Sequence, residues 1–167
     1  MADLTIALAG NPNAGKTTIF NALTGLHQHT GNWPGKTVEK KEGEIELGDL
    51  TINVVDLPGT YSLTAYSPEE IIARDYIIEE RPDVVVNVVD ATNLERNLYL
   101  TVQILELDVP VVLALNMTDD LHKDGAKINV STLSEMLGNI PIISTTANQG
   151  KGIDELIAAA VKAAGKN

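Results

Sequence analysis

The chain has 167 residues, the length of one ordinary domain, and carries 23 Asp and Glu against 12 Lys and Arg, a formal net charge of −11. An acidic surface repels nucleic acid and anionic lipid, so this composition excludes recognition through a broad basic patch. The sequence has no cysteine, which excludes disulfides and thiolate metal sites, and no apolar run approaches the roughly 18–20 residues that span a bilayer.

The first half of the chain alternates apolar runs with segments rich in turn formers. A helix follows the first strand and ends near Gly25, and Pro68 stands at the start of another helix. Residues 26–36 have no hydrophobic period and many turn formers, which predicts a mobile loop. The predicted strands of this half are residues 4–9, 38–47 and 50–55, the last two forming a hairpin, and its second helix covers residues 68–80.

The second half repeats the pairing of strand and helix. Residues 84–89 are nearly all β-branched, as expected for a parallel strand buried on both faces. Further strands are predicted at residues 111–115 and 140–143, and helices at residues 94–105 and 153–164. This alternation predicts one α/β domain with an open, mostly parallel sheet of about six strands, one of them antiparallel, and roughly five helices over both faces.

A glycine-rich turn with the spacing G-x-x-x-x-G-K-T links the first strand to the first helix. The backbone N–H groups of such a turn and the positive end of the helix dipole together bind anions. Gly10 and Gly15 let the backbone approach phosphates, Lys16 can reach the β- and γ-phosphates, and the Thr17 hydroxyl can ligate Mg²⁺. The turn therefore predicts a nucleoside triphosphate site, formed by Gly10, Asn11, Pro12, Asn13, Ala14, Gly15, Lys16, Thr17 and Thr18.

Polar segments follow three further predicted strands. In open α/β sheets, ligands lie at the carboxyl ends of the strands, so these segments are candidates for the rest of the site. Each is common in unrelated sequences, but together, in this order and behind a phosphate loop, they predict a nucleotide site built from several loops. They are Asp56-Leu57-Pro58-Gly59, Asn116-Met117-Thr118-Asp119 and Ser144-Thr145-Thr146-Ala147.

This constellation resembles the GTP-binding domains of the translation-factor-related G proteins and, within them, the N-terminal cytosolic G domains of ferrous iron transport protein B. The resemblance extends over essentially the whole chain, residues 1–167, and implies a single Ras-like G domain of the P-loop NTPase class. Beyond the loops already named, it rests on two long runs, Gly31-Asn32-Trp33-Pro34-Gly35-Lys36-Thr37-Val38-Glu39 and Asn87-Val88-Val89-Asp90-Ala91-Thr92-Asn93-Leu94-Glu95-Arg96-Asn97-Leu98.

The resemblance implies a role for each matching residue. Thr17 and Thr37 would ligate Mg²⁺, and Asp56 would hold a Mg²⁺-bound water. The Gly59 N–H would contact the γ-phosphate, so that hydrolysis would release two switch loops. Asp119 would accept two hydrogen bonds from guanine, a pair that adenine cannot supply. Catalytic roles are implied for Asn13, Lys16, Thr37 and Gly59.

Further nucleotide contacts are implied around these residues. Asn116 would tie its own loop to the phosphate loop, and the Ala147 N–H would meet guanine O6. The remaining contacts would come from Gly35, Lys36, Leu57, Pro58, Met117, Thr118, Thr146 and Asn148.

Four positions bear on how this site would differ from commoner G proteins. Met117 replaces the lysine of the usual N-K-x-D motif, which predicts loose nucleotide binding and fast release, and Thr146 replaces a serine, a minor change. Thr60 stands where Ras-like proteins carry the glutamine that orients the attacking water, so intrinsic hydrolysis is expected to be slow. Asn13 matches an asparagine ligand of potassium-activated G proteins, which implies K⁺ as a second cation; alternatively, Asn13 hydrogen-bonds within its own loop.

The resemblance also implies a setting for the domain. It would be a soluble fragment of a longer polypeptide, held at the cytoplasmic face of the cell membrane, with the transporter's own helical and transmembrane domains as partners. GTP would be the substrate and GDP a product, the nucleotide state would be coupled to Fe(II) transport, and a homo-oligomer could form through the full-length protein. No nucleic-acid partner is expected.

Two other functions remain open from the sequence. A GTPase of ribosome or RNA maturation shares this style of phosphate loop, although the net charge of −11 counts against it. An ATP-using P-loop kinase is a further alternative. Asn116 and Asp119 count against it, because they match a motif that binds guanine and not adenine.

Two features of residues 26–36 admit more than one interpretation. His27 and His29 form an H-x-H pair that could bind a metal or lie in an exposed loop, and the sequence offers no further ligands nearby. Trp33, the single tryptophan, could anchor a partner or pack over the nucleotide site.

Overall fold

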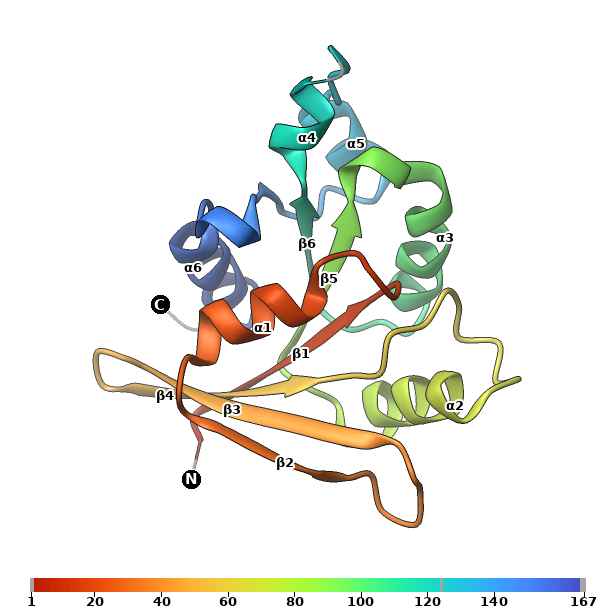
Figure 1. The fold of residues 1–167 in the computed structure, drawn as a ribbon, viewed down its shortest axis with the longest axis vertical. Helices are drawn as coiled ribbons and strands as arrows, with labels where there is room; N and C mark the ends of the chain where they lie inside the picture. Colours follow the sequence, from red (N-terminus) through yellow and green to blue (C-terminus); the bar gives the residue numbers. More distant parts are fainter. Residues whose placement is uncertain (1, 124, 166–167) are drawn as a thin grey trace.

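The computed structural model of the chain describes residues 2–123 and 125–165, and the strands in these ranges form one seven-stranded sheet (Figure 1). The strand order is β2-β3-β4-β1-β5-β6-β7. Because β3 pairs antiparallel with both β2 and β4 while the other pairings are parallel, β3 runs against the rest of these strands. The strands are β1 (Leu4–Gly10), β2 (Gln28–Asn32), β3 (Glu39–Leu47), β4 (Leu50–Asp56), β5 (Val84–Asp90), β6 (Val111–Asn116) and β7 (Ile142–Ser144).

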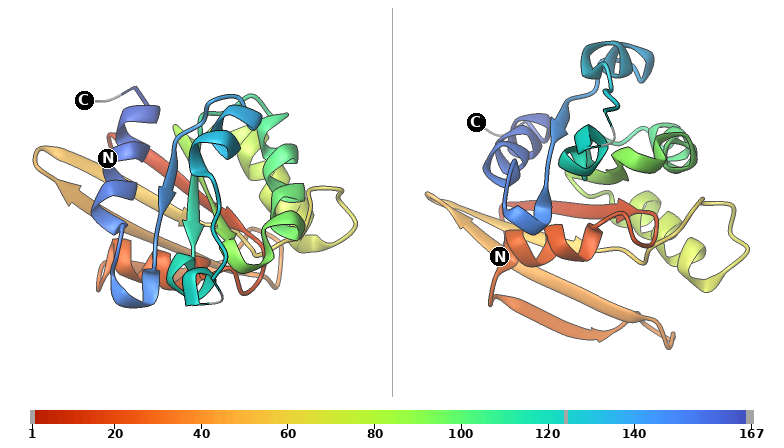
Figure 2. Two further views of the ribbon diagram at one scale, coloured as in Figure 1. Left: turned by 90° about the horizontal axis from the view of Figure 1, so that it is seen from above. Right: turned by 45° about the horizontal axis from the view of Figure 1, so that its top comes forward.

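Six α-helices lie in the same two ranges, on both faces of the sheet (Figure 2). None of the helices described there is both long enough and apolar enough to cross a membrane. A π-helical turn, η1 (Tyr76–Glu80), continues α2, and η2 (Ala91–Asn93) and η3 (Ala147–Gln149) are short 3₁₀ turns. The α-helices are α1 (Lys16–Thr24), α2 (Pro68–Asp75), α3 (Leu94–Leu105), α4 (Thr118–Lys123), α5 (Val130–Met136) and α6 (Ile153–Ala163).

The predicted α/β architecture with one reversed strand is confirmed, but the predicted numbers of strands and helices need correction. Within the described residues the sheet has seven strands rather than about six, because β2 lies inside residues 26–36, where a loop was predicted. β2 is an edge strand whose residues 29–32 are exposed, and it is held by backbone pairing with β3. Such a strand needs no apolar alternation, so the hydrophobic pattern could not reveal it. The short helix α5 likewise buries a single residue, Leu133, and has no clear period.

The core has two main layers, one on each face of the central strands. Alternate residues of β1 point to opposite faces, as a strand requires. Ile6 and Leu8 pack in the cluster that contains α1 and α6, whereas Ala7 and Ala9 pack in the cluster that contains α2 and α3. The parallel strands therefore end together at one edge of the sheet, where the loops after β1, β4, β6 and β7 meet.

Candidate functional site

The phosphate loop leaves β1 at Gly10 and continues into α1. A Cβ at Gly10 would lie 2.7 Å from the Val88 carbonyl oxygen, and a Cβ at Gly15 would collide with the side-chain amide of Asn116. Gly15 has φ 94° and Asn13 has φ 71°, both in the left-handed region. The loop is thus closely packed against its neighbours, and both glycines are needed for that packing.

A buried ion pair joins this loop to the end of β4. The Lys16 ammonium donates a hydrogen bond to the Asp56 carboxylate, and each of the two residues is 8% exposed. Burial raises the pKa of the Asp56 carboxyl above its ordinary value, and the Lys16 charge opposes that change. The structure therefore places an ammonium and a carboxylate side by side next to the phosphate loop.

An open cavity of about 560 Å³ lies over the phosphate loop. Gly59 reaches this cavity from the loop after β4 because it packs against Pro12, and the Thr60 N–H donates to the Gly10 carbonyl over 3.1 Å. The cavity brings together residues that the sequence assigned to one site. They are Asn11, Pro12, Asn13, Gly15, Lys16, Thr17, Thr18, Gly59 and Met117.

The buried side-chain amide of Asn116 connects three loops. Its Nδ2 donates to the Ala14 carbonyl at 3.0 Å, which is the tie to the phosphate loop that the sequence predicted. Its Oδ1 accepts hydrogen bonds from the Thr145 hydroxyl at 2.9 Å and from the Ala147 N–H at 3.1 Å. The Ala147 N–H, predicted to meet guanine O6, thus donates to Asn116 in this structure.

A smaller cavity of about 140 Å³ adjoins the phosphate loop on the side of Asn116. Asp119 is not among its lining residues: its carboxylate accepts a hydrogen bond from the Lys151 ammonium at 3.0 Å. That contact lowers the pKa of Asp119 below its ordinary value. The residues that line the cavity are Gly15, Thr18, Asn116, Met117, Asp120, Thr146, Ala147 and Asn148.

The loop that carries Thr37 does not join this assembly. Trp33 closes a tight turn, since its N–H donates to the Val38 carbonyl at 2.9 Å and its carbonyl accepts from the Lys36 N–H at 2.9 Å. Thr37 and Gly35 are exposed on that turn, and neither lines the cavity over the phosphate loop. The structure therefore groups Thr17 with Lys16 and Asp56 but does not place Thr37 with them.

The oxygen groups beside the phosphate loop fit the magnesium ion that this class of site implies. Thr17 offers a hydroxyl on the first turn of α1, and Asp56 offers a carboxylate at the end of β4. Hydroxyl and carboxylate oxygens are the ligands that Mg²⁺ prefers, usually with water and substrate phosphates completing its shell. Within residues 2–123 and 125–165 no three His, Asp or Glu side chains converge on a common point, and so His27 and His29 are not joined by a third such ligand.

Comparison with known proteins decides the family. Residues 4–160 match the protein-family model described as Ferrous iron transport protein B. The chain belongs to this family. Two curated relatives are similar over most of it: an Fe(2+) transport protein A/Fe(2+) transporter FeoB fusion protein of Porphyromonas gingivalis is 55% identical over 92% of the chain, and the Fe(2+) transporter FeoB of Escherichia coli is 52% identical over 93%.

Solved structures of FeoB domains are similar to this chain over nearly its whole length. The cytosolic domain of Thermotoga maritima FeoB, determined in a GDP form, is 48% identical with a TM-score of 0.92, covering 98% of this chain and 64% of that one. The FeoB G-domain of Methanococcus jannaschii is 51% identical with a TM-score of 0.87, covering 99% of this chain and all of that one. The fold is therefore the Ras-like G domain. The chain spans about a fifth of the length of its curated relatives, 18% and 21% of the two named above.

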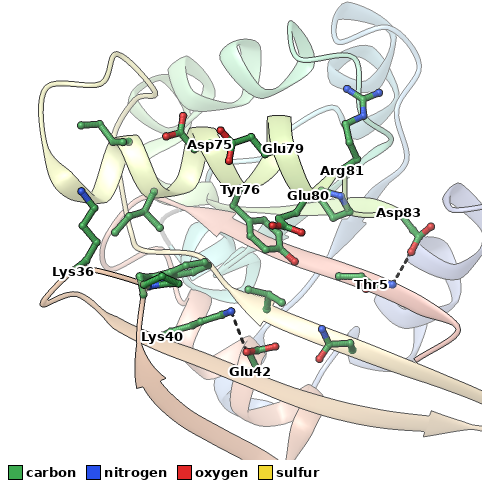
Figure 3. Close-up of a pocket in the computed structure, with 17 residues that line it drawn as sticks. Thr5, Lys36, Lys40, Glu42, Asp75, Tyr76, Glu79, Glu80, Arg81 and Asp83 are labelled. Atoms are coloured by element: carbon green, nitrogen blue, oxygen red, sulfur yellow. Dashed lines mark hydrogen bonds and ion pairs between the residues drawn. The ribbon is translucent and has the colours of Figure 1, made fainter. Parts of the chain in front are cut away.

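In this member of the Ferrous iron transport protein B family, Trp33 packs away from the phosphate loop. It is 6% exposed, meets Tyr76 edge-on with ring centroids 5.7 Å apart, and lies under the Lys40 ammonium at 4.8 Å. The two rings border a groove of about 690 Å³ between η1 and strands β3 and β4, with charged side chains around it (Figure 3). Burial raises the pKa of Tyr76 to about 12. The interpretation of Trp33 as a cover over the nucleotide site was therefore wrong.

The loop after Gly59 is fixed by the carboxylate of Glu70, a residue in the first turn of α2. Glu70 accepts hydrogen bonds from Ser62 Oγ at 2.5 Å and Thr64 Oγ1 at 2.7 Å. These bonds lower the pKa of Glu70 from its usual 4.5 to about 2. The S-P-E-E run could have signalled the helix cap, in which Ser67 Oγ accepts from the Glu70 N–H, but not the contacts to the loop.

This pKa predicts acid sensitivity of the loop. Because the folded-state pKa of Glu70 is below the ordinary value, its bonds stabilise the loop above pH 4.5 and are lost as the pH falls from 4.5 toward about 2. The Leu63 N–H donates to Gln103 Oε1 at 2.6 Å, and its amide exchange protection is expected to decrease through that range in the parent protein. Glu70→Gln should reduce this protection already at pH 5 and remove its pH dependence, while Glu69→Gln should behave like the parent. Equal protection in the parent at pH 5 and pH 2.5 would contradict the role of Glu70.

Proposed function

We propose that this chain binds GTP with Mg²⁺ and hydrolyses it to GDP and phosphate, as the switch domain of a ferrous iron uptake transporter. The observation that carries the proposal is the Asn116 amide. It joins the phosphate loop, at Ala14, to the loop after β7, at Ala147. The segments that we propose to bind the phosphates and the base therefore share one edge of the sheet. The GDP form of a similar FeoB cytosolic domain supports the assignment of the nucleotide.

Each group near the phosphate loop has a chemical task in this proposal. Lys16 and the backbone N–H groups of the loop would bind the β- and γ-phosphates, and the Gly59 N–H would bind the γ-phosphate. Thr17, Thr37 and Asp56 would hold Mg²⁺, Asp56 through a water, and the ion would neutralise charge on the phosphates. Lys16 would then exchange its bond to Asp56 for a bond to phosphate. Asp119 would read the guanine edge.

Hydrolysis would be slow without further help. Thr60 occupies the glutamine position but has no side-chain amide with which to orient water. Its backbone N–H is bonded to the Gly10 carbonyl, and the residue is 5% exposed. We propose that K⁺, held in part by Asn13, supplies the missing positive charge. Asn13 is exposed and lines the cavity over the phosphate loop.

The rest of the transporter sets the context of this domain. Because the curated relatives are about five times longer than this chain, we propose that it is one part of a polypeptide whose helical and transmembrane domains respond to the nucleotide state. The domain would then lie at the cytoplasmic face of the membrane, and oligomers would form through the full-length protein. The named relatives are iron transporters, so a GTPase of RNA maturation is not favoured.

Nucleotide preference and turnover test the proposal. Calorimetric titration is expected to show binding of GDP and of a GTP analogue in the presence of Mg²⁺, with ADP much weaker. GTP, but not ATP, is expected to be converted to the diphosphate and inorganic phosphate, and Lys16→Ala should stop this turnover. Equal binding of ADP and GDP would rule out a guanine-specific switch.

Emission from Trp33 is expected to differ between the GDP complex and the complex with a non-hydrolysable GTP analogue. Recruitment of Thr37 to Mg²⁺ would move the turn of residues 33–38 and draw the indole from its contact with Tyr76 into water, shifting emission to longer wavelength. Trp33 is the single tryptophan, so steady-state fluorescence reports this turn.

Variants of two nearby threonines provide the comparison. Thr37→Ala should give the same spectrum in both complexes, whereas Thr30→Ala, at an exposed position of β2, should keep the parental difference. If the parent itself shows one spectrum with both nucleotides and one pattern of protease cleavage at this turn, the turn is not a switch.

A further inference from the structure

Lys151, from the loop after β7, forms an ion pair with Asp119, the carboxylate that would bind the guanine base. Lys151 Nζ is 3.0 Å from Asp119 Oδ2, and the side chains of the two residues are 61% and 33% exposed. The segment Asn116–Asp119 itself carries no lysine, because Met117 stands at the position of the N-K-x-D lysine. The ammonium at Asp119 therefore comes from the opposite loop, 32 residues further along the chain.

The backbone of Lys151 is held firmly in this place. Lys151 and Thr146 exchange two hydrogen bonds, of 3.1 Å and 3.2 Å, which form an isolated antiparallel bridge. Gly150 and Gly152 flank Lys151 with φ 70° and 83°, and a Cβ at Gly152 would collide with the Ser144 carbonyl. The turn thus fixes the backbone from which the Lys151 side chain reaches Asp119.

We infer that Lys151 is a specificity-determining residue of the guanine site, and this inference rests on the proposed function. Guanine presents two donors, N1–H and the 2-amino group, and it needs both oxygens of Asp119 to accept them. Lys151 already donates to one of those oxygens, so one of the two guanine donors must compete with the ammonium for it. Binding of guanine therefore requires the ammonium to share Oδ2 or to leave it.

Comparing guanine with hypoxanthine separates the competition between Lys151 and the base for Asp119 from general changes in nucleotide affinity. Hypoxanthine has N1–H but lacks the 2-amino group, so one carboxylate oxygen suffices, and Oδ1 is not engaged by Lys151. Lys151 should consequently weaken the binding of GDP but not that of IDP. An exposed ion pair contributes little, so the expected effect is about two- to fivefold.

The test measures the affinities of GDP and IDP by titration calorimetry for the parent, Lys151→Met, Lys151→Arg and Lys162→Met. Lys162 lies in the last turn of α6 and serves as the control for the change in net charge. Lys151→Met is expected to bind GDP about two- to fivefold more tightly, chiefly through slower release, with IDP unchanged. Lys151→Arg and Lys162→Met should resemble the parent. The GDP difference between parent and Lys151→Met should shrink as salt is raised, because salt screens the exposed pair.

The possible results separate this inference from the proposed function. If the parent binds GDP through Asp119 and Lys151→Met changes GDP and IDP equally, or leaves GDP unchanged or weaker, Lys151 has no role in specificity and the proposed function stands. If Asp119→Asn binds GDP as the parent does, Asp119 does not read the base and only the inference about Lys151 is overturned. If the parent does not prefer GDP over ADP, both the inference and the proposed function are overturned.

Discussion

Asp119→Asn is expected to weaken the binding of GDP and GTP by about tenfold to a hundredfold, since loss of a charged hydrogen bond costs about 1.5–3 kcal/mol. The carboxylate offers two acceptors to the two donors of guanine, whereas an amide offers one acceptor and one donor. Xanthine presents a donor and an acceptor on the same edge, so the variant should bind XDP better than the parent does. Calorimetric titration with GDP and XDP measures both changes.

The neighbouring aspartate provides a matched control. Asp120 lines the cavity of about 140 Å³ beside the phosphate loop, whereas Asp119 pairs with Lys151. The motif spacing assigns the base to Asp119, so Asp120→Asn should leave GDP affinity nearly unchanged. If Asp120→Asn weakens GDP and Asp119→Asn does not, the base has been assigned to the wrong carboxylate.

The sheet was predictable from the sequence where strands are buried on both faces. β5 and β6 are buried at every position, and they are apolar except for Asn87 and Asp90 in β5 and Asn116 at the end of β6. Such a composition is typical of a strand buried on both faces of a parallel sheet. β2 was not predictable, because an exposed edge strand is specified by its pairing with β3 and not by its own composition. The π-helical turn η1 was missed for a related reason: residues 76–80 continue the apolar pattern of α2, and that pattern does not distinguish the two helix types.

The residues of the candidate site likewise fall into two groups, those that a local sequence pattern predicts and those that depend on tertiary contacts. The phosphate loop was predictable because its glycines and lysine have a fixed spacing within one strand–turn–helix unit, and Asn116 because its motif follows a buried strand. The pairing of Lys151 with Asp119 depends on a turn 32 residues away, and no local pattern reports it. Thr37 was assigned by motif, yet its turn is anchored by Trp33, whose burial beside Tyr76 is a tertiary contact.

The charge of the protein limits how the phosphates can be neutralised. With a net charge of −11, the long-range field repels a nucleotide, so binding must come from local donors. Lys16 is close to the phosphate loop but is shared with Asp56, and Arg96 is stacked over the Tyr61 ring at 4.4 Å. A cation bound with the nucleotide is therefore the simplest source of additional positive charge.

Replacing NaCl by KCl at equal ionic strength is expected to raise GTP turnover by at least about tenfold, equivalent to about 1.4 kcal/mol of barrier. Negative charge develops on the leaving group between the α- and γ-phosphates, and a cation held there would stabilise it. Asn13, with φ 71° and an exposed side chain in the cavity over the phosphate loop, offers an amide oxygen. The Gly31–Gly35 segment would add carbonyl oxygens only once the turn of residues 33–38 has moved toward the nucleotide. Initial rates of phosphate release measure the effect.

Asn13→Ala should lose the gain from KCl while keeping the slow rate seen in NaCl, because the amide oxygen would be a ligand of the cation and not of the nucleotide. Asn148→Ala is the matched control, since Asn148 lines the cavity beside Asn116 rather than the one over the phosphate loop, and its response to KCl should equal that of the parent. A KCl response that survives in Asn13→Ala would mean that Asn13 bonds only within its own loop. Equal parental rates in the two salts would exclude activation by potassium, and acceleration of hydrolysis would then have to come from a partner protein.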